Sequence, residues 1–378
     1  MKFCKTCLST DLRPQAEFVS GICLPCRYSK SGAAGDQTKL KILREKFKNS
    51  RKSQKNKGAY DCIVGVSGGK DSTRQAHWVR DRLGLRPLVV CSGYTPKQMS
   101  KTGAKNLSNL ISMGFDFIIA TPAPQTAAQA ALASLKNFGN LCKASEMNLF
   151  STVPRIAIEL GVNTLFWGEN TALQVGDSAV EGADEFDANN LRNMSTLTSG
   201  GNDWLARTVR APYLLNHYVY PTEIQFEKAK INIFFLGPVW DDWSNEENAT
   251  YASLQGLTLR PGEELQTGDL SNASMIDEEF TNINMMIKYF KFGFGRATDF
   301  VDEKIRNGLL SREKAIEIVK VYDGVCSDEI IAKFSAYVGI SVEEFWQITN
   351  KWVNKDLFEI HGSNRPVPKF EVGVDYDC

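Results

Sequence analysis

The chain has 378 residues, 43% of them hydrophobic, and its 44 Lys and Arg balance 44 Asp and Glu. These values are ordinary for a soluble globular protein and predict two or three domains. A net charge of zero argues against nucleic acid or an anionic membrane as a bulk partner. We see no apolar leader at the N-terminus and no stretch long enough to cross a bilayer, so we expect a cytoplasmic protein.

The first 35 residues contain four cysteines in two closely spaced pairs. Cys4-x-x-Cys7 and Cys23-x-x-Cys26 are separated by fifteen residues, which is the spacing of a four-thiolate zinc site. Four protein ligands close a tetrahedral site, so we expect a structural Zn²⁺ rather than a catalytic one. We predict that residues 1–35 form a zinc-binding module too small to fold without its metal. The apolar residues available for its own core are Phe3, Leu8, Phe18, Val19 and Ile22.

Residues 36–59 are predicted to form a basic helix and linker. From Lys39 to Lys57, nine of nineteen residues are Lys or Arg, and only Glu45 is acidic. This run fits either a solvated helix or a face that binds RNA or phosphate. We favour the solvated helix, because the run has no interleaved aromatic residue beyond Phe47.

Residues 60–72 read Y-D-C-I-V-G-V-S-G-G-K-D-S, which predicts a buried strand, a glycine turn and the start of a helix. The two consecutive glycines allow backbone N–H groups to approach phosphate oxygens, and the helix start adds unpaired donors. The lysine adds a positive charge, and the aspartate after it is suited to Mg²⁺ between itself and the phosphates. The predicted magnesium-nucleotide site consists of Ser67, Gly68, Gly69, Lys70, Asp71 and Ser72.

This loop differs from the phosphate-binding loop of kinases and GTPases, which needs four residues between its glycines and a hydroxyl after its lysine. Gly65 and Gly69 have three residues between them, and Lys70 is followed by Asp71. S-G-G-K-D-S resembles instead the PP-loop of the ATP pyrophosphatase superfamily, whose members cleave ATP to AMP and pyrophosphate. The resemblance implies ATP and Mg²⁺ as cofactors, and Lys70 and Asp71 as catalytic residues.

The pattern after the loop alternates strands and helices, which predicts a doubly wound α/β domain over residues 60–260. The resemblance to the superfamily implies a parallel sheet of the HUP type. We expect strands at 88–91, 115–120, 163–167 and 231–236, and helices at 97–113, 127–138 and 145–160. Glu169 and Asn170 follow the strand at 163–167, at the edge where open α/β sheets bind ligands. We therefore select both as candidate substrate-binding residues, although a loop or cap role for Glu169 fits equally well.

Residues 171–222 lose this periodicity and are rich in Gly, Asp, Asn and Ser. Structureless segments of this length are uncommon in compact domains. We therefore predict a long functional loop or lid.

The last third, residues 261–378, is predicted to be mainly helical and to bind the substrate or a partner. We expect helices at 277–289, 311–322, 327–338 and 341–354. Lys288, Lys291 and Arg296 gather around a Gly-x-Gly turn, where the backbone can approach a ligand closely. A solvated helix end is one interpretation; we favour binding of a phosphate or carboxylate.

Three features together resemble the PP-loop N-acetyl sugar amidotransferases of bacterial surface-polysaccharide biosynthesis, which serve lipopolysaccharide O-antigens and nonulosonic acids. They are the four-cysteine module, the V-S-G-G-K-D-S loop, and the segments F-W-G-E-N, I-K-Y-F-K-F-G-F-G-R-A-T-D-F and I-R-N-G-L-L-S-R-E-K-A. The resemblance runs along most of the chain. It implies adenylation of a sugar acetamido group and replacement of its oxygen by ammonia, which gives an acetamidino sugar, AMP and pyrophosphate. The sugar is expected to be nucleotide-linked.

We find no glutaminase signature: Lys2 stands where an N-terminal nucleophile requires cysteine, and the segment around Cys326 lacks the second glycine of a nucleophile elbow. We therefore expect ammonia from a separate glutaminase and its cyclase-like partner. The alternative is a tRNA-thiolating PP-loop enzyme, which the basic run favours. Zero net charge and the isolation of Cys142 and Cys326 argue against it. A third possibility is a scaffold that binds nucleotide without turnover.

Overall fold

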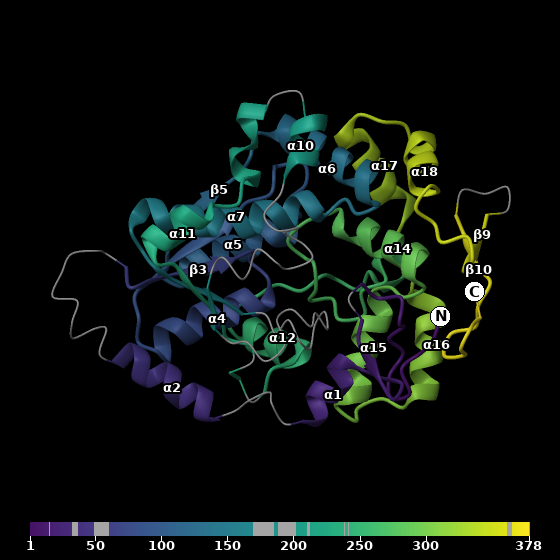
Figure 1. Ribbon diagram of the computed structural model, residues 1–378, viewed down its shortest axis with the longest axis horizontal. Helices are drawn as coiled ribbons and strands as arrows, with labels where there is room; N and C mark the ends of the chain where they lie inside the picture. The colour runs from purple at the N-terminus through teal and green to yellow at the C-terminus, as the bar shows by residue number, and fades with distance from the viewer. Residues whose placement is uncertain are drawn as a thin grey trace.

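The computed structural model describes residues 1–14, 16–31, 37–48, 60–168, 185–187, 202–209, 212–237, 239–240, 242–360 and 365–377. Figure 1 shows an α/β layer formed by the middle of the chain and a group of C-terminal helices beside it. The N-terminal segment lies against these C-terminal helices rather than beside the segment that follows it in the chain. Among the described helices, none combines the length and apolar character needed to cross a membrane.

Six strands form one sheet in the order β5-β4-β3-β6-β8-β7. They are β3 (Cys62–Val66), β4 (Pro87–Ser92), β5 (Asp116–Ala120), β6 (Thr164–Trp167), β7 (Glu185–Asp187) and β8 (Asn232–Phe235). Five of them pair in parallel, and only the edge strand β7 is antiparallel. The chain runs outward from β3 through β4 to β5 and then places β6 on the other side of β3. This topology confirms the doubly wound sheet, and its switch point lies between β3 and β6.

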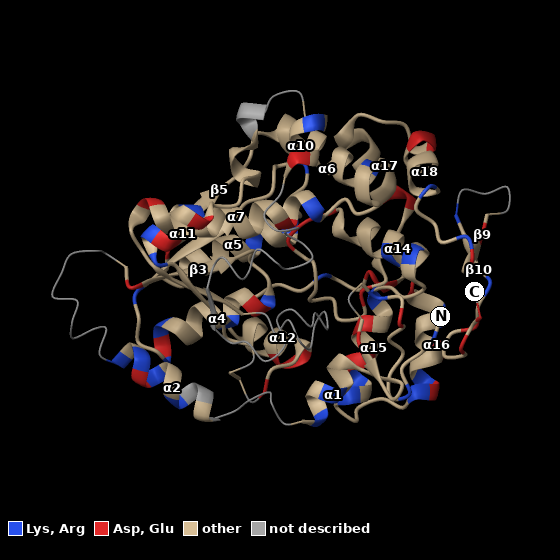
Figure 2. Ribbon diagram, viewed as in Figure 1, with Lys and Arg blue, Asp and Glu red and all other residues tan. Residues whose placement is uncertain are grey.

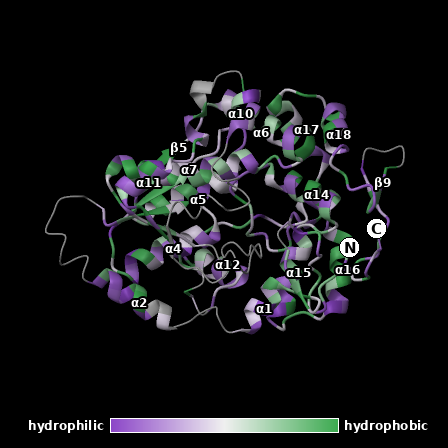
Figure 3. Ribbon diagram, in the orientation of Figure 1, coloured by the Kyte–Doolittle hydropathy of each residue, from purple (hydrophilic) through white to green (hydrophobic). Residues whose placement is uncertain are grey.

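Helices cover both faces of the sheet because successive strand residues point to opposite sides. They are α2 (Gln37–Lys48), α4 (Lys70–Asp81), α5 (Lys101–Ser112), α7 (Lys143–Leu160) and α11 (Glu223–Ala229). Val64 of β3 packs in the core with α2, α4 and α5, whereas Ile63 packs with α7 and α11. Figure 3 shows the hydrophobic strands between these helices. Figure 2 shows several Lys and Arg residues along α2. This helix is not fully solvated as we had expected, because it buries Leu43 and Phe47 against the sheet.

Part of the segment predicted as a structureless loop is folded. Within it lie β7, α10 (Asp203–Thr208) and the 3₁₀ helix η3 (Pro212–Tyr218). Leu205 and Leu215 are buried against Ala130 and Ala133 of α6 (Pro124–Phe138). The low sequence periodicity had concealed these short elements: α10 and η3 pack against α6, and β7 pairs with β8.

The C-terminal region is helical, as predicted. Just before it, within the predicted α/β domain, lies α12 (Asn245–Leu254). The elements of the C-terminal region are α13 (Glu264–Thr267), α14 (Thr281–Phe292), α15 (Arg296–Arg306), α16 (Arg312–Tyr322), α17 (Asp328–Val338), α18 (Val342–Thr349), β9 (Phe358–Glu359) and β10 (Val367–Pro368). The sequence had not predicted α15. Its N-terminus is capped by a distant residue: Asp323 accepts hydrogen bonds from Gly295 N at 2.8 Å and Thr298 N at 3.1 Å. No local capping residue therefore marks the start of this helix.

The N-terminal module consists of a hairpin, β1 (Phe18–Val19) and β2 (Ile22–Cys23), followed by α1 (Leu24–Lys30). Phe3 and Leu8 had been expected to form its own core. Instead they are buried in the hydrophobic core of the C-terminal helices. Leu8 N also donates to Asp302 of α15 at 2.7 Å, and Ser9 Oγ donates to the same carboxylate at 2.8 Å. The module thus shares its core with residues about three hundred positions away.

Candidate active site

The predicted nucleotide-binding loop lies at the carboxyl end of β3, where it turns into α4 beside the switch point of the sheet. Gly68 has φ +91°, and a Cβ atom there would lie 3.1 Å from Leu107 Cδ2. Only glycine adopts this conformation without strain. The first N–H groups of α4 have no partner inside the helix, so the loop presents backbone donors to an anion.

The two serines of the motif form hydrogen bonds within the turn. Ser67 Oγ accepts from Gly69 N at 3.3 Å, and Ser72 Oγ donates to Gly69 O at 3.2 Å. Thr73 Oγ1 donates to the same carbonyl at 2.8 Å. These bonds fix the shape of the loop before any ligand binds.

Asp71 is held by two side chains. Lys70 Nζ lies 2.8 Å from Asp71 Oδ2, and Asn248 Nδ2 of α12 donates to Asp71 Oδ1 at 2.6 Å. Arg74 Nη1 in turn donates to Asn248 Oδ1 at 2.6 Å, and its guanidinium lies 4.6 Å from the Trp240 ring centre. The sequence did not predict this chain of hydrogen bonds from Arg74 through Asn248 to Asp71. Arg74 follows Asp71 by one helical turn, but nothing in the sequence indicates that Asn248 reaches the same place.

Two hollows adjoin the loop and share Ser67 and Leu149. The first is lined by Gly65, Val66, Ser67, Gly69, Asp71, Ser72, Leu149, Phe150 and Trp167. The second is lined by Ser67, Ser92, Gly93, Tyr94, Thr95, Gln98, Pro122, Ala127, Ala144, Ser145, Asn148, Leu149 and Tyr218. Both open at the carboxyl edge of the parallel strands, where doubly wound sheets bind nucleotides. Trp167 Nε1 is buried beside the loop and has no hydrogen-bond partner among the described residues.

Two acidic residues before α14 reach the edge of these hollows. Burial raises the pKa of Asp277, and hydrogen bonds from the side chains of Tyr94 and Ser67 partly offset that shift. Burial also raises the pKa of Glu278 to about 8, although Phe280 N donates to its carboxylate at 2.8 Å. Nothing in the sequence points to this position, because an Asp-Glu pair before a helix resembles an ordinary helix start.

Glu169 and Asn170, the two predicted substrate-binding residues after β6, lie outside the described residues. The described chain reaches Gly168, whose carbonyl accepts from Trp243 Nε1 at 3.1 Å. A Cβ atom at Gly168 would lie 2.9 Å from Asp71 O. The residue before Glu169 is therefore packed against the nucleotide-binding loop.

Of the three predicted anion-binding cations, Lys288 pairs directly with a carboxylate, which it shares with Arg13. Lys288 Nζ lies 2.5 Å from Asp299 Oδ2, and Arg13 of the N-terminal module lies 2.5 Å from Asp299 Oδ1. Burial opposes ionisation of Asp299, but the charges of Lys288, Arg13 and Arg296 outweigh it and lower the pKa of this carboxyl group. We call Arg13, Lys288, Arg296 and Asp299 the cationic cluster.

The third cation, Lys291, has other contacts. Its Nζ donates to Phe138 O at 2.6 Å, at the C-terminal end of α6, where helix carbonyls carry partial negative charge. Burial lowers the pKa of Lys291 to about 8. Its part in substrate binding stays a prediction.

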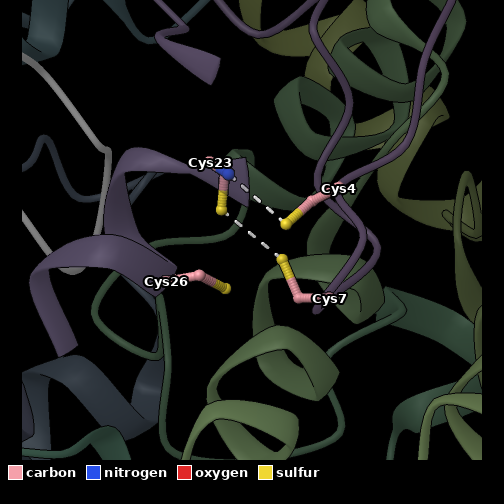
Figure 4. Close-up of side chains that lie close together, drawn as sticks. All are labelled: Cys4, Cys7, Cys23 and Cys26. Atoms are coloured by element: carbon pink, nitrogen blue, oxygen red, sulfur yellow. Dashed lines mark hydrogen bonds between the residues drawn. The ribbon is translucent and has the colours of Figure 1, made fainter. Parts of the chain in front are cut away.

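The four predicted metal-binding cysteines converge, as Figure 4 shows. Their sulfur atoms lie within 4.8 Å of one another, with Cys7 Sγ and Cys23 Sγ 3.6 Å apart. Four sulfurs bound to one Zn²⁺ would be separated by about 3.8 Å, whereas a disulfide bond is about 2.0 Å long. Backbone N–H groups also point at Cys4 Sγ, from Thr6 and Cys23, each at 3.4 Å. The cluster therefore fits a single tetrahedral ion better than a 4Fe-4S cluster, in which each thiolate binds a separate iron.

Comparison with known proteins bears on the C-terminal region. Residues 275–367 match the family model for the C-terminal domain of WbpG-like lipopolysaccharide (LPS) biosynthesis proteins. No curated protein is significantly similar to the chain. Among solved structures, the chain is similar to the U34-tRNA thiolase NcsA from Methanococcus maripaludis with its 4Fe-4S cluster, at 12% identity and a TM-score of 0.29, over 89% of this chain and 95% of that chain. Because this TM-score is low, the similarity carries no argument. The fold is assigned from the order and direction of the strands.

The matched region borders the second hollow. Glu278 accepts from Gln98 Nε2 at 3.3 Å, and the Tyr337 hydroxyl lies 3.1 Å from Thr95 Oγ1. Gln98 and Thr95 line that hollow. The part of the chain that is similar to LPS biosynthesis proteins is thus in contact with the candidate active site.

Proposed function

We propose that the protein is an ATP-dependent amidotransferase that converts the acetamido group of a sugar into an acetamidino group, forming AMP and pyrophosphate. The observation that carries this proposal is that the region similar to LPS biosynthesis proteins contacts Gln98 and Thr95, which line the same hollow as Ser67 of the S-G-G-K-D-S loop. The loop supports AMP-forming use of ATP. The similarity of residues 275–367 supports a surface-polysaccharide sugar as the second substrate.

The proposed chemistry begins with activation, because an amide carbonyl is a poor electrophile. The amide oxygen attacks the α-phosphorus of ATP, and pyrophosphate leaves with the electrons of the broken P–O bond. Ammonia then adds to the O-adenylyl imidate carbon, AMP leaves with the former amide oxygen, and a proton is released. Backbone donors of the loop and Lys70 would stabilise the negative charge that develops on pyrophosphate. Mg²⁺ held by Asp71 would neutralise part of the same charge.

The substrate and partners follow from the same proposal. Lys288, Lys291 and Arg296 are our candidates to bind an anionic group of a nucleotide-linked, N-acetylated sugar, and Glu169 and Asn170 to contact the substrate. Ammonia would come from a separate glutaminase with its cyclase-like partner. The four cysteines would hold a structural Zn²⁺, and an enzyme that uses ATP and a nucleotide sugar would work in the cytoplasm.

The tRNA-thiolation alternative gains no support from Cys142 and Cys326, the two isolated cysteines considered for it. A cysteine that carries sulfur must be an accessible thiolate. Cys142 and Cys326 are both buried, and burial raises the pKa of Cys326 to about 12. Burial also raises the pKa of Cys142.

The test is a reaction with purified protein, ATP, Mg²⁺, ammonium at alkaline pH and a set of N-acetylated nucleotide sugars. Mass spectrometry should find a sugar lighter by the difference between oxygen and NH, with AMP in equal amount. Glutamine should not replace ammonium unless a glutaminase is added. Formation of ADP, or thiolation of tRNA by the same preparation, would contradict the proposal.

A further inference from the structure

The cationic cluster contains more positive charge than its own carboxylate neutralises. Arg13 and Lys288 both bind Asp299, and both also lie over the Phe294 ring, at 4.3 and 4.5 Å from its centre. An aromatic ring attracts a cation, but it does not replace a counter-charge in a partly desolvated site. The cluster therefore has capacity for another anion.

Arg296, the other cation of the cluster, lies near a carboxylate that it shares with another arginine. Arg296 Nε lies 3.9 Å from Asp269 Oδ1, but Asp269 already binds Arg260, whose Nη1 is 3.1 Å from Oδ2. Arg296 Nη2 donates to Ser274 Oγ, which is neutral. Arg260 also lies 3.6 Å from Glu263 Oε2, so Asp269 and Glu263 together balance Arg260 and Arg296. The excess positive charge of the cluster is that of Arg13 and Lys288 over Asp299.

Two hydrogen-bond donors of the cluster are unused. The Nε atoms of Arg13 and Arg296 are buried and have no hydrogen-bond partner among the described residues. Buried donors without partners are rare in folded proteins because each costs about 1–3 kcal/mol. The side chains of Arg13, Lys288 and Arg296 nevertheless remain 14%, 18% and 16% exposed, so solutes can reach the cluster. An anionic ligand at the exposed parts of these side chains would neutralise the excess positive charge.

The cluster lies close to the nucleotide-binding loop along the chain. Arg296 binds Ser274, which precedes Asp277 by three residues, and Asp277 contacts Ser67 of the loop. Three residues span at most about 10 Å. A nucleotide-linked sugar is long enough to place its acetamido group at the loop while an anionic group at its other end reaches the cluster.

We propose that the cationic cluster binds the phosphate or carboxylate of the sugar substrate, and that Arg13 makes the N-terminal cysteine module part of the substrate site. The identity of the substrate rests on the proposed function, whereas the anion site rests on the contacts above. The N-terminus of α15, where Arg296 is the first helical residue, adds its partial positive charge. The metal then has a functional consequence, because it fixes the segment that carries Arg13.

The kinetic test uses Arg13→Gln in the full-length enzyme. The KM for the sugar should rise roughly tenfold or more, the effect of losing about 1.4 kcal/mol of binding energy, while kcat and the KM for ATP change little. Arg296→Gln should behave in the same way, and Arg13→Lys should recover part of the affinity. The matched control is Arg27→Gln, which removes an arginine of the same module that pairs with Glu17 on the surface. An unchanged sugar KM in Arg13→Gln, or an equal rise in Arg27→Gln, would overturn the proposal.

A binding measurement separates this inference from the proposed reaction. Calorimetric titration with inorganic phosphate and with malonate should detect one anion site that Arg13→Gln and Arg296→Gln remove and Arg27→Gln retains. Preference for phosphate or for malonate then identifies the chemistry of the ligand group. Equal anion binding by wild type and Arg13→Gln would show that Arg13 only attaches the module to α15. If the site behaves as expected but no acetamidino sugar ever forms, the proposed function fails and the anion site stands.

Discussion

The nucleotide-binding loop and the cationic cluster differ in how their residues are distributed along the chain. The loop is one continuous segment, residues 67–72, in which a turn, a helix start and a lysine occur together. The cluster instead joins Arg13 to Lys288, Arg296 and Asp299, which are more than 270 residues away. Both present positive charge to an anion, but only the loop carries its geometry in local sequence.

This difference has a thermodynamic consequence. The loop is fixed by hydrogen bonds between near neighbours, such as Thr73 Oγ1 to Gly69 O at 2.8 Å. The cluster depends on docking of the N-terminal module, through Leu8 and Ser9, onto Asp302. Disturbing the module should therefore damage the cluster and leave the loop intact.

The largest expected effect comes from the loop. Asp71→Asn removes the charge proposed to act on Mg²⁺, so kcat should fall by roughly a hundredfold or more, with a smaller change in the sugar KM. Pyrophosphate release measures the first step directly. The matched control is Asp81→Asn, at the exposed C-terminal end of the same helix, which should keep wild-type turnover. Wild-type pyrophosphate release from Asp71→Asn would show that this carboxylate has another role.

A second change separates the two sites. Cys23→Ser should release the metal, lower the melting temperature by several degrees and raise the sugar KM, because a structural metal contributes folding energy. ATP affinity should change little. Elemental analysis, thermal unfolding and ATP titration provide the three measurements. The control is Cys326→Ser, which alters a buried cysteine outside the four-cysteine cluster and should retain the metal. Full retention of the metal by Cys23→Ser would contradict the assignment of the four cysteines as its ligands.

The last prediction concerns the cap of α15 and bears on stability rather than on either site. Burial raises the pKa of Asp323 to about 6, from an ordinary value of 3.8. The folded state therefore binds this proton more tightly, so the stability it contributes is complete below about pH 4 and is lost as pH rises through 6. Asp323→Asn should remove this slope, worth about 3 kcal/mol at most. Urea unfolding at pH 4 and pH 6 measures how the free energy of unfolding depends on pH. Asp328→Asn, which alters an exposed aspartate, is the control. An unchanged pH dependence in Asp323→Asn would refute the shifted pKa.

The sequence predicted the sheet and the loop because their signals are local. The apolar run of β3, the glycine turn and the helix start stand next to one another, and the strands alternate with helices. It did not predict α15, whose cap comes from Asp323, or the contact of Asn248 with Asp71. Nor did it indicate that Arg13 and Lys288 bind the same carboxylate, Asp299. These features arise only when distant segments pack, so no spacing rule detects them.

The most direct test of the account follows the oxygen atom of the acetamido group. If that oxygen attacks ATP and ammonia then displaces AMP, heavy oxygen placed in the acetyl carbonyl of the sugar must be recovered in AMP. The acetamidino product should carry none. Mass spectrometry of both products gives the answer in one reaction. Unlabelled AMP formed together with the acetamidino sugar would show that the amide oxygen never reaches phosphorus, and would contradict the proposed activation at the S-G-G-K-D-S loop.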